Sequence, residues 1–323
     1  MARTSAPKLA LKRGALIAAA NWQVVAVQFI ADTIFTALLA VPVAGGAMLV
    51  LLTSGLAPGD LIRQGVRRAV PAVAAALLAQ PIALAAFLTA VLLVLLGGSL
   101  LLAFIKGGTI SVLVASEREA GPIEVPPLRA AAVRRANRFS LEHATTGAQR
   151  LFGRFAWLGG VLFVAYAAVL ATALGALVSV GSPDSAWEAA RIAGLTAAVA
   201  TTITVVNLLY LLTQIAITVD DCDVRTALAR VGRLLYAQPF ELGFVFVSML
   251  SLLALGVAAS LLATAALGLI AFVPFVGLAA VPLQVAAWVV RSFLFQYLGL
   301  AALVAYVQLY RRSRGPTGGG IAA

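Results

Sequence analysis

The densest group of carboxylates in the sequence stands at Asp220, Asp221 and Asp223. Carboxylates at such spacing are ligands that Ca²⁺ or Mg²⁺ accepts, but the group lacks the glycine and the distal glutamate of a calcium loop. An aspartate that precedes a helix accepts hydrogen bonds from its free N–H groups and complements its dipole. An amphipathic segment follows here, so we predict helix capping and expect no bound metal or cofactor.

Nucleophilic chemistry has few candidate residues. The chain has one histidine, His143, and one cysteine, Cys222. A Cys–His pair would need both residues to meet, and no neighbouring residue is placed to orient them. A single cysteine also excludes an intramolecular disulfide and a His/Cys metal cluster. We therefore expect a protein that is not an enzyme.

The remaining candidates are polar residues inside long apolar runs, where an ionisable group is costly and usually faces a partner or a cavity. Asp32 lies near the middle of the first run, one helical turn from Gln28. Asn207 and Gln214 approximately match this pair in depth, and Arg291 lies in the last run. Either these residues line a polar path, or they tie helices together at about 1 kcal/mol or less per tie. We predict that Asp32 faces Asn207.

The composition defines the elements that position these residues. Hydrophobic residues make up 62% and charged residues 11% of the chain, whereas soluble domains carry about 25% charge. The apolar residues come in runs of about 20 or more, the length that crosses a bilayer as a helix. We predict an all-α polytopic transmembrane bundle of about six spans. They cover residues 24–52, 71–105, 158–180, 192–219, 244–272 and 282–310.

The second of these runs has two interpretations. Gly97 and Gly98 lie near its middle, so residues 71–115 form either one long helix or a tight hairpin.

Basic residues predict the orientation, because Lys and Arg accumulate on the cytoplasmic side. Residues 106–154 contain eight of them, the N-terminus four, and the C-terminal end Arg311, Arg312 and Arg314. We predict a multi-pass protein of the bacterial inner membrane with both termini and a central loop at 106–154 in the cytoplasm. Residues 1–314 form one membrane domain and residues 315–323 a disordered tail. Three arginines at 55–69 would then face outward, so the orientation of that connection stays open.

Short amphipathic elements precede the later spans. In the segment 223–235, apolar residues recur at helical spacing and arginines lie off that stripe. The apolar residues are Val224, Leu228, Val231 and Leu235, and the arginines are Arg225, Arg230 and Arg233. We predict a cytoplasmic elbow helix with its apolar side in lipid and its arginines at anionic headgroups. Segments 60–68 and 127–138 share Val-Arg-Arg-Ala and suggest similar elbows.

Two segments resemble a known group of proteins. The run ITVDDCDVRTALARVGRLL, followed by an apolar segment, resembles the acidic turn, Ala-Leu-x-Arg elbow and span of uncharacterised bacterial six-helix membrane proteins. These include the membrane domain attached to some glycerophosphodiester phosphodiesterases. The run FIKGGTISVLVASEREAGPI is similar to their Gly-Gly segment. The resemblance implies the architecture and no activity.

The net charge of +11 would suggest nucleic acid in a soluble protein. In a membrane protein, cytoplasmic loops and the anionic leaflet account for it, so we expect membrane lipids as partners and no nucleic acid. The leading hypothesis is a non-enzymatic integral membrane protein that organises partners or lipids, with self-association left open. The alternative is a small transporter or permease with a polar intramembrane site around Asp32. A water-filled cavity that reaches Asp32 would favour transport, and a dry core would favour the first hypothesis.

Overall fold

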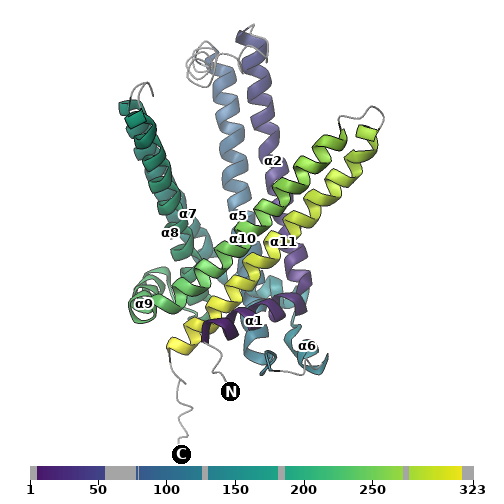
Figure 1. Ribbon diagram of the computed structural model, residues 1–323. Helices are drawn as coiled ribbons and strands as arrows, with labels where there is room; N and C mark the ends of the chain where they lie inside the picture. The colour runs from purple at the N-terminus through teal and green to yellow at the C-terminus, as the bar shows by residue number, and fades with distance from the viewer. Residues whose placement is uncertain are drawn as a thin grey trace, which may run out of the picture. The chain divides into compact units, whose positions relative to one another are not determined.

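The computed structural model describes residues 6–54, 78, 80–125, 130–180, 186–271 and 276–314. These residues form helices and connecting turns and no strand (Figure 1). Six of the helices are long and apolar enough to cross a membrane, which confirms the predicted all-α, six-span architecture. In chain order the helices are α1 (Ala6–Ala20), α2 (Trp22–Ser54), α5 (Pro81–Glu119), α6 (Ala130–Ala136), α7 (Leu141–Val180), α8 (Ala186–Asp220), α9 (Val224–Ala237), α10 (Pro239–Ala271) and α11 (Val276–Ser313).

Some predictions concern residues outside the described ranges. These are the elbow at 60–68, the orientation of the connection at 55–69, and the disordered tail at 315–323. The elbow at 127–138 is described from residue 130 onward and contains the short helix α6.

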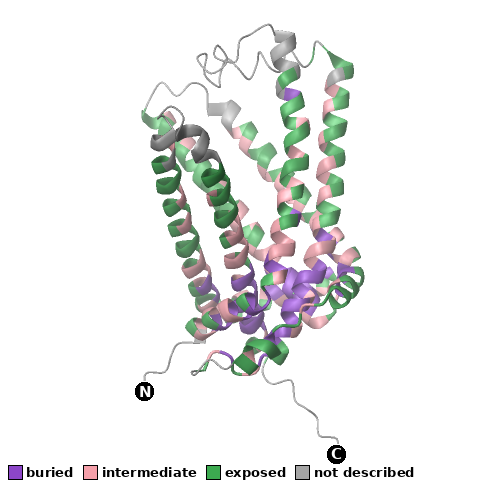
Figure 2. Cartoon of the chain, turned by 90° about the vertical axis from the view of Figure 1, so that its right-hand side faces the viewer, coloured by how far each residue is buried: buried purple, intermediate pink, exposed green. Residues whose placement is uncertain are grey.

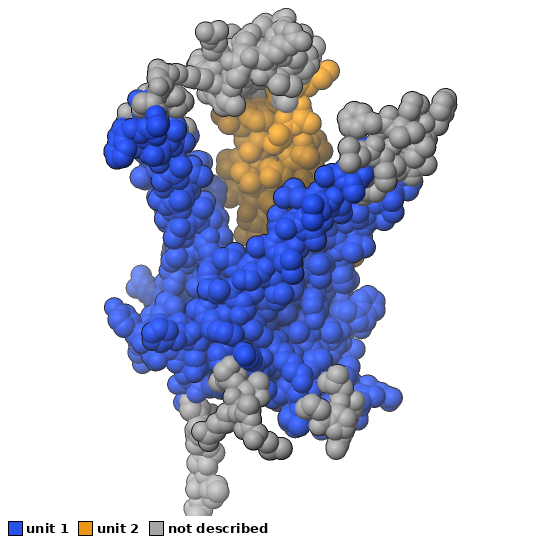
Figure 3. Space-filling view, viewed as in Figure 1, with its two compact units in different colours: residues 1–29, 103–323 blue, residues 30–102 orange. Residues whose placement is uncertain are grey.

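The chain divides into two compact units (Figure 3). Unit 1 comprises Met1–Phe29 and Ala103–Ala323, and unit 2 comprises Ile30–Leu102. The boundary between them passes through α2 and α5, so each of these helices contributes to both units.

Unit 2 consists of most of α2 and the first part of α5. Helix α5 continues through Gly97 and Gly98 without a break, so the described part of the second apolar run is one helix and not a hairpin. The glycine at position 98 serves helix packing, because a Cβ atom there would collide with the ring of Phe35 on α2. Glycine here lets the aromatic ring lie against the backbone of α5, which is how small residues bring membrane helices together.

The core of unit 1 gathers at one end of its helices, where buried residues are concentrated (Figure 2). Helix α1 is part of this core, since Ala10, Ile17 and Ala18 are fully buried. It packs against α11, where the hydroxyl of Tyr297 donates a hydrogen bond of 3.0 Å to the carbonyl of Ala15. We call this end of unit 1 the polar end; it holds α1, α6, α9, Glu117, Asp220 and Tyr310.

The spans bury little of their surface within the protein. In five of the six candidate spans, at most 17% of the most apolar window is buried, and only Pro282–Ser313 reaches 50%. Exposed side chains such as Leu93 and Leu262 would oppose folding in water, but hydrocarbon covers them without cost. The described spans are therefore those of a membrane protein, with lipid or further protein around them.

The central segment at 106–154 differs from the expected loop, because it is mostly helical. Helix α5 extends to Glu119 and α7 begins at Leu141. The start of α7 is capped by the Ser140 hydroxyl, which accepts a hydrogen bond from the backbone N–H of His143 at 3.1 Å. Four of the eight basic residues of this segment, Lys106, Arg118, Arg150 and Arg154, thus lie on helices that extend from the spans.

Candidate functional site

Asp220, the last residue of α8, is the centre of one charged cluster at the polar end. Its carboxylate, 4% exposed, lies 2.6 Å from a guanidinium nitrogen of Arg230 on α9 and forms a second ion pair with Arg314. The hydroxyl of Tyr310 on α11 donates a further hydrogen bond to it. One buried carboxylate thereby ties α8 and α9 to the end of α11.

This finding corrects the capping prediction for two of the three aspartates. Asp220 and Asp221 are ion-pair partners instead of helix caps, with Asp221 lying 2.5 Å from Arg154 of α7. The hydrogen bond from Arg154 lowers the pKa of the Asp221 carboxyl. Asp223 does occupy the N-cap position of α9, where its carbonyl accepts a hydrogen bond from Ala227, but its side chain makes no cap hydrogen bond.

A second charged cluster centres on Arg13 of α1. Its guanidinium lies 3.4 Å from the carboxylate of Glu117 and 2.8 Å from that of Glu124. It also donates hydrogen bonds to the carbonyls of Glu117 and Gly121 at 2.8 and 2.5 Å. Glu117 forms an additional ion pair with Arg311 of α11. The cluster joins α1, the end of α5 and the end of α11.

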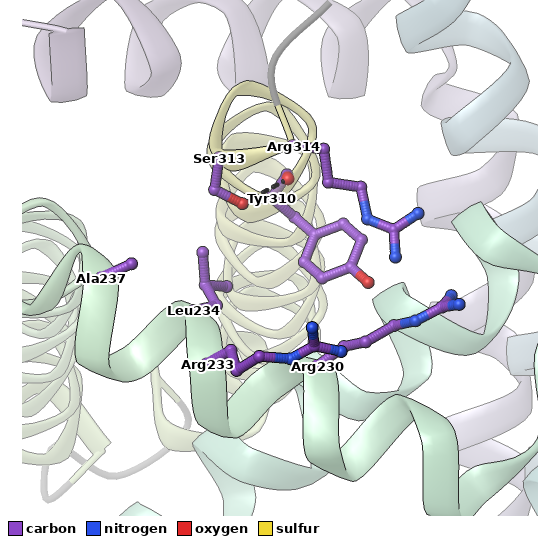
Figure 4. Close-up of a pocket in the computed structure, with 7 residues that line it drawn as sticks. All are labelled: Arg230, Arg233, Leu234, Ala237, Tyr310, Ser313 and Arg314. Atoms are coloured by element: carbon purple, nitrogen blue, oxygen red, sulfur yellow. Dashed lines mark hydrogen bonds between the residues drawn. The ribbon is translucent and has the colours of Figure 1, made fainter. Parts of the chain in front are cut away.

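A cavity of about 250 Å³ opens between α9 and the end of α11. Its lining includes Arg230, Arg233, Tyr310 and Arg314. Figure 4 shows the ring of Tyr310 between Arg314 and the two arginines of α9. Arg233 is exposed and makes no ion pair with any residue that the structure describes. Three guanidinium groups beside one carboxylate give this cavity a positive charge.

Helix α9 forms as predicted, but its apolar face packs on protein. The residues buried on it are Val224, Ala227, Val231 and Leu234. The prediction of a lipid-facing stripe is therefore wrong for Val224 and Val231, whereas Leu228 is 44% exposed. Of the candidate lipid-contact arginines, Arg225 and Arg233 are exposed and Arg230 is engaged by Asp220.

Two of the five predicted intramembrane polar residues make contacts between helices. Asn207 of α8 accepts a hydrogen bond of 2.5 Å from the hydroxyl of Tyr166 on α7. Arg291 of α11 donates one of 3.1 Å to Ser260 on α10 and lies over the ring of Phe295. Both contacts join neighbouring spans within unit 1.

The other three intramembrane candidates make no such contact with the described residues. Gln214 is buried and its amide nitrogen has no hydrogen-bond partner, and the amide oxygen of Gln28 is likewise buried without one. Asp32 is exposed and belongs to unit 2. Because Asn207 belongs to unit 1, the pairing of Asp32 with Asn207 stays a prediction.

Comparison with protein-family models, curated proteins and solved structures found no match.

Sequence reasoning missed Arg13 and Glu117, two buried charged residues of the polar end. A signal was present, because Ala10, Arg13 and Ile17 recur at helical spacing and thus share one face of α1. An arginine on an otherwise apolar face indicates a buried partner. Counting Arg13 only toward the overall basic charge of the N-terminus concealed that pattern.

Proposed function

We propose that this chain is a non-enzymatic integral membrane protein that binds anionic phospholipid headgroups at its polar end and so organises lipids around it. The cavity between α9 and α11 carries this proposal. Arg230, Arg233 and Arg314 line it beside the single carboxylate of Asp220. Guanidinium groups bind phosphate oxygens through paired, charge-assisted hydrogen bonds.

The surroundings of the cavity suit a headgroup. It lies at the end of α11, a candidate span, and therefore at the depth where headgroups meet a spanning helix. Tyr236 and Phe240, at the turn from α9 to α10, are 93% and 91% exposed. Aromatic side chains are enriched at membrane–water interfaces. Under this proposal the polar end and both termini face the cytoplasm of a bacterial cell, where the leaflet attracts basic residues.

The test replaces Arg233 by glutamine, since this residue forms no ion pair with the described residues that the change could break. A charge-assisted hydrogen bond to a phosphate oxygen contributes about 1.5 kcal/mol or more, so phosphatidylglycerol binding should weaken at least about ten-fold. Binding is measured by titrating the full chain in neutral detergent micelles with phosphatidylglycerol and, separately, with phosphatidylcholine. Added salt should weaken only the first interaction.

Arg225→Gln is the matched control, because Arg225 is exposed on the same helix and does not line this cavity. We expect it to weaken phosphatidylglycerol binding by about five-fold or less, because it removes only general attraction to the anionic surface, about 1 kcal/mol. Equal losses for the two variants, or equal affinity of the unmodified chain for both lipids, would refute binding in the cavity.

A further inference from the structure

A second cavity of the polar end, of about 280 Å³, lies between α5, α7 and the end of α8. Its polar lining comes from both long helices. Ser111 and Arg118 stand seven residues apart on α5, and His143, Thr146 and Arg150 follow at spacings of three and four on α7. Residues at these spacings share one face of a helix, so each helix directs a polar face toward the cavity.

Close packing of the two helices places a hydroxyl at the cavity. Gly147 on α7 is buried against Ser111 of α5, and a Cβ atom on Gly147 would lie 2.5 Å from the Cβ and 2.6 Å from the Oγ of Ser111. No larger residue leaves the serine in this position. The lining therefore combines hydroxyl groups, an imidazole and guanidinium groups in a defined arrangement.

The charge of this cavity is positive. Arg118 and Arg150 approach it from different helices, and Arg118 is exposed and makes no ion pair within the described part of the chain. The one carboxylate of the lining, Asp221, is already paired with Arg154 at 2.5 Å. Arg118 and Arg150 thus line the cavity, and its one carboxylate forms an ion pair with a different arginine.

We propose that this cavity binds a phosphate-bearing anion, held by Arg118 and Arg150 together with the hydroxyl of Thr146. Phosphate oxygens accept bidentate hydrogen bonds from guanidinium groups and single ones from hydroxyl and imidazole N–H groups. The volume is slightly below that of pockets for drug-sized ligands, which suits a phosphate with a small substituent. This chemistry is shared by a lipid headgroup and a soluble phosphate compound. The site is separate from the arginine cavity of α9 and α11.

The test uses the full chain in neutral detergent micelles, with inorganic phosphate as the probe in isothermal titration calorimetry. Arg118→Gln and Arg150→Gln should each weaken phosphate binding about ten-fold, since each removes a charge-assisted pair. Thr146→Val preserves the shape and the charge and should weaken it two- to three-fold. Arg134→Gln, an exposed change on α6 outside the lining, should leave it unchanged.

Two outcomes overturn the inference. One is the absence of phosphate binding to the unmodified chain. The other is an equal loss for Arg118→Gln and Arg134→Gln, which would show general attraction by surface charge. Arg233→Gln should not alter the phosphate binding that Arg118→Gln and Arg150→Gln weaken, so the failure of this inference is distinguishable from the failure of the proposed lipid site.

The source of the phosphate group is identified in lipid nanodiscs. Phosphate binding is compared in discs of phosphatidylcholine alone and in discs that also contain phosphatidic acid. If phosphate binding is lost in the discs that contain phosphatidic acid, the occupant is a lipid headgroup. Arg118→Gln should then reduce the difference in phosphate binding between the two kinds of disc. Unchanged binding identifies a soluble phosphate compound. Both results support the site itself.

Discussion

Replacing Arg13 by methionine tests whether the polar end is held together by buried charge. The side chain of Arg13 is 10% exposed, and its partners Glu117 and Glu124 are 8% and 14% exposed. Removing one member of a buried ion pair costs about 3–5 kcal/mol, because the other charge is left buried. Glu117 retains Arg311, so we expect about 3 kcal/mol, a change of roughly 150-fold in the unfolding equilibrium.

The assay is equilibrium unfolding of the full chain in mixed micelles, with dodecyl sulfate as the denaturant and tryptophan fluorescence as the signal. Lys12→Met is the matched control. Lys12 neighbours Arg13 on α1 but is exposed and donates one hydrogen bond, to the carbonyl of Glu124. Surface substitutions of this kind change stability by about 0.5 kcal/mol or less.

Losses of equal size for Arg13→Met and Lys12→Met would refute the buried-charge argument. A double-mutant cycle gives a second check, since Arg13 and Arg311 share Glu117. The Arg13 substitution should cost more in an Arg311→Met background, where Glu117 keeps no partner. Additive effects would mean that the two arginines act independently.

Four further outcomes are expected. Burial raises the pKa of the Cys222 thiol, so the pH midpoint of its alkylation by iodoacetamide should lie above that of the same thiol in unfolded chain; identical midpoints would contradict this. Asp220→Asn removes two ion pairs whose arginines are about one third exposed, and the loss in unfolding free energy should be about 2 kcal/mol, below the full buried-pair value because those arginines regain water. For the proposed orientation, a reporter active only in the cytoplasm should work when fused after Thr145 and one active only after export should work after Ser185; the reverse pattern would invert the topology. Asp32→Asn should leave stability nearly unchanged if Asp32 is a helix tie, whereas loss of ion-coupled uptake in reconstituted vesicles would establish the transporter alternative.

The number and positions of the spans could be predicted from the sequence because the hydrocarbon thickness fixes the length of an apolar helix. Hydrocarbon thickness does not predict whether Gly97 and Gly98 form a turn or lie within a continuous helix. A glycine pair is compatible with a turn and with close helix packing, and the choice depends on Phe35, more than sixty residues earlier in the chain.

Helix α9 shows a different limit of sequence reasoning. Its periodicity correctly predicts an amphipathic helix, but a hydrophobic stripe does not specify what covers it. Protein covers Val224 and Val231 in unit 1, where lipid was expected. The sequence also does not specify the partners of Asp220, because Tyr310 and Arg314 lie about ninety residues further along the chain.

Asp220 has a further consequence for ligand binding at the polar end. Its carboxylate cancels part of the positive charge of the α9 and α11 cavity, and it also holds the guanidinium groups of Arg230 and Arg314 at defined places. Groups that are already ordered lose less conformational entropy when a ligand binds. A cavity that bound anions by charge attraction alone would bind them more tightly without this carboxylate. The presence of Asp220, 4% exposed and bound by three side chains, favours a cavity in which the arrangement of the arginines matters as much as their charge.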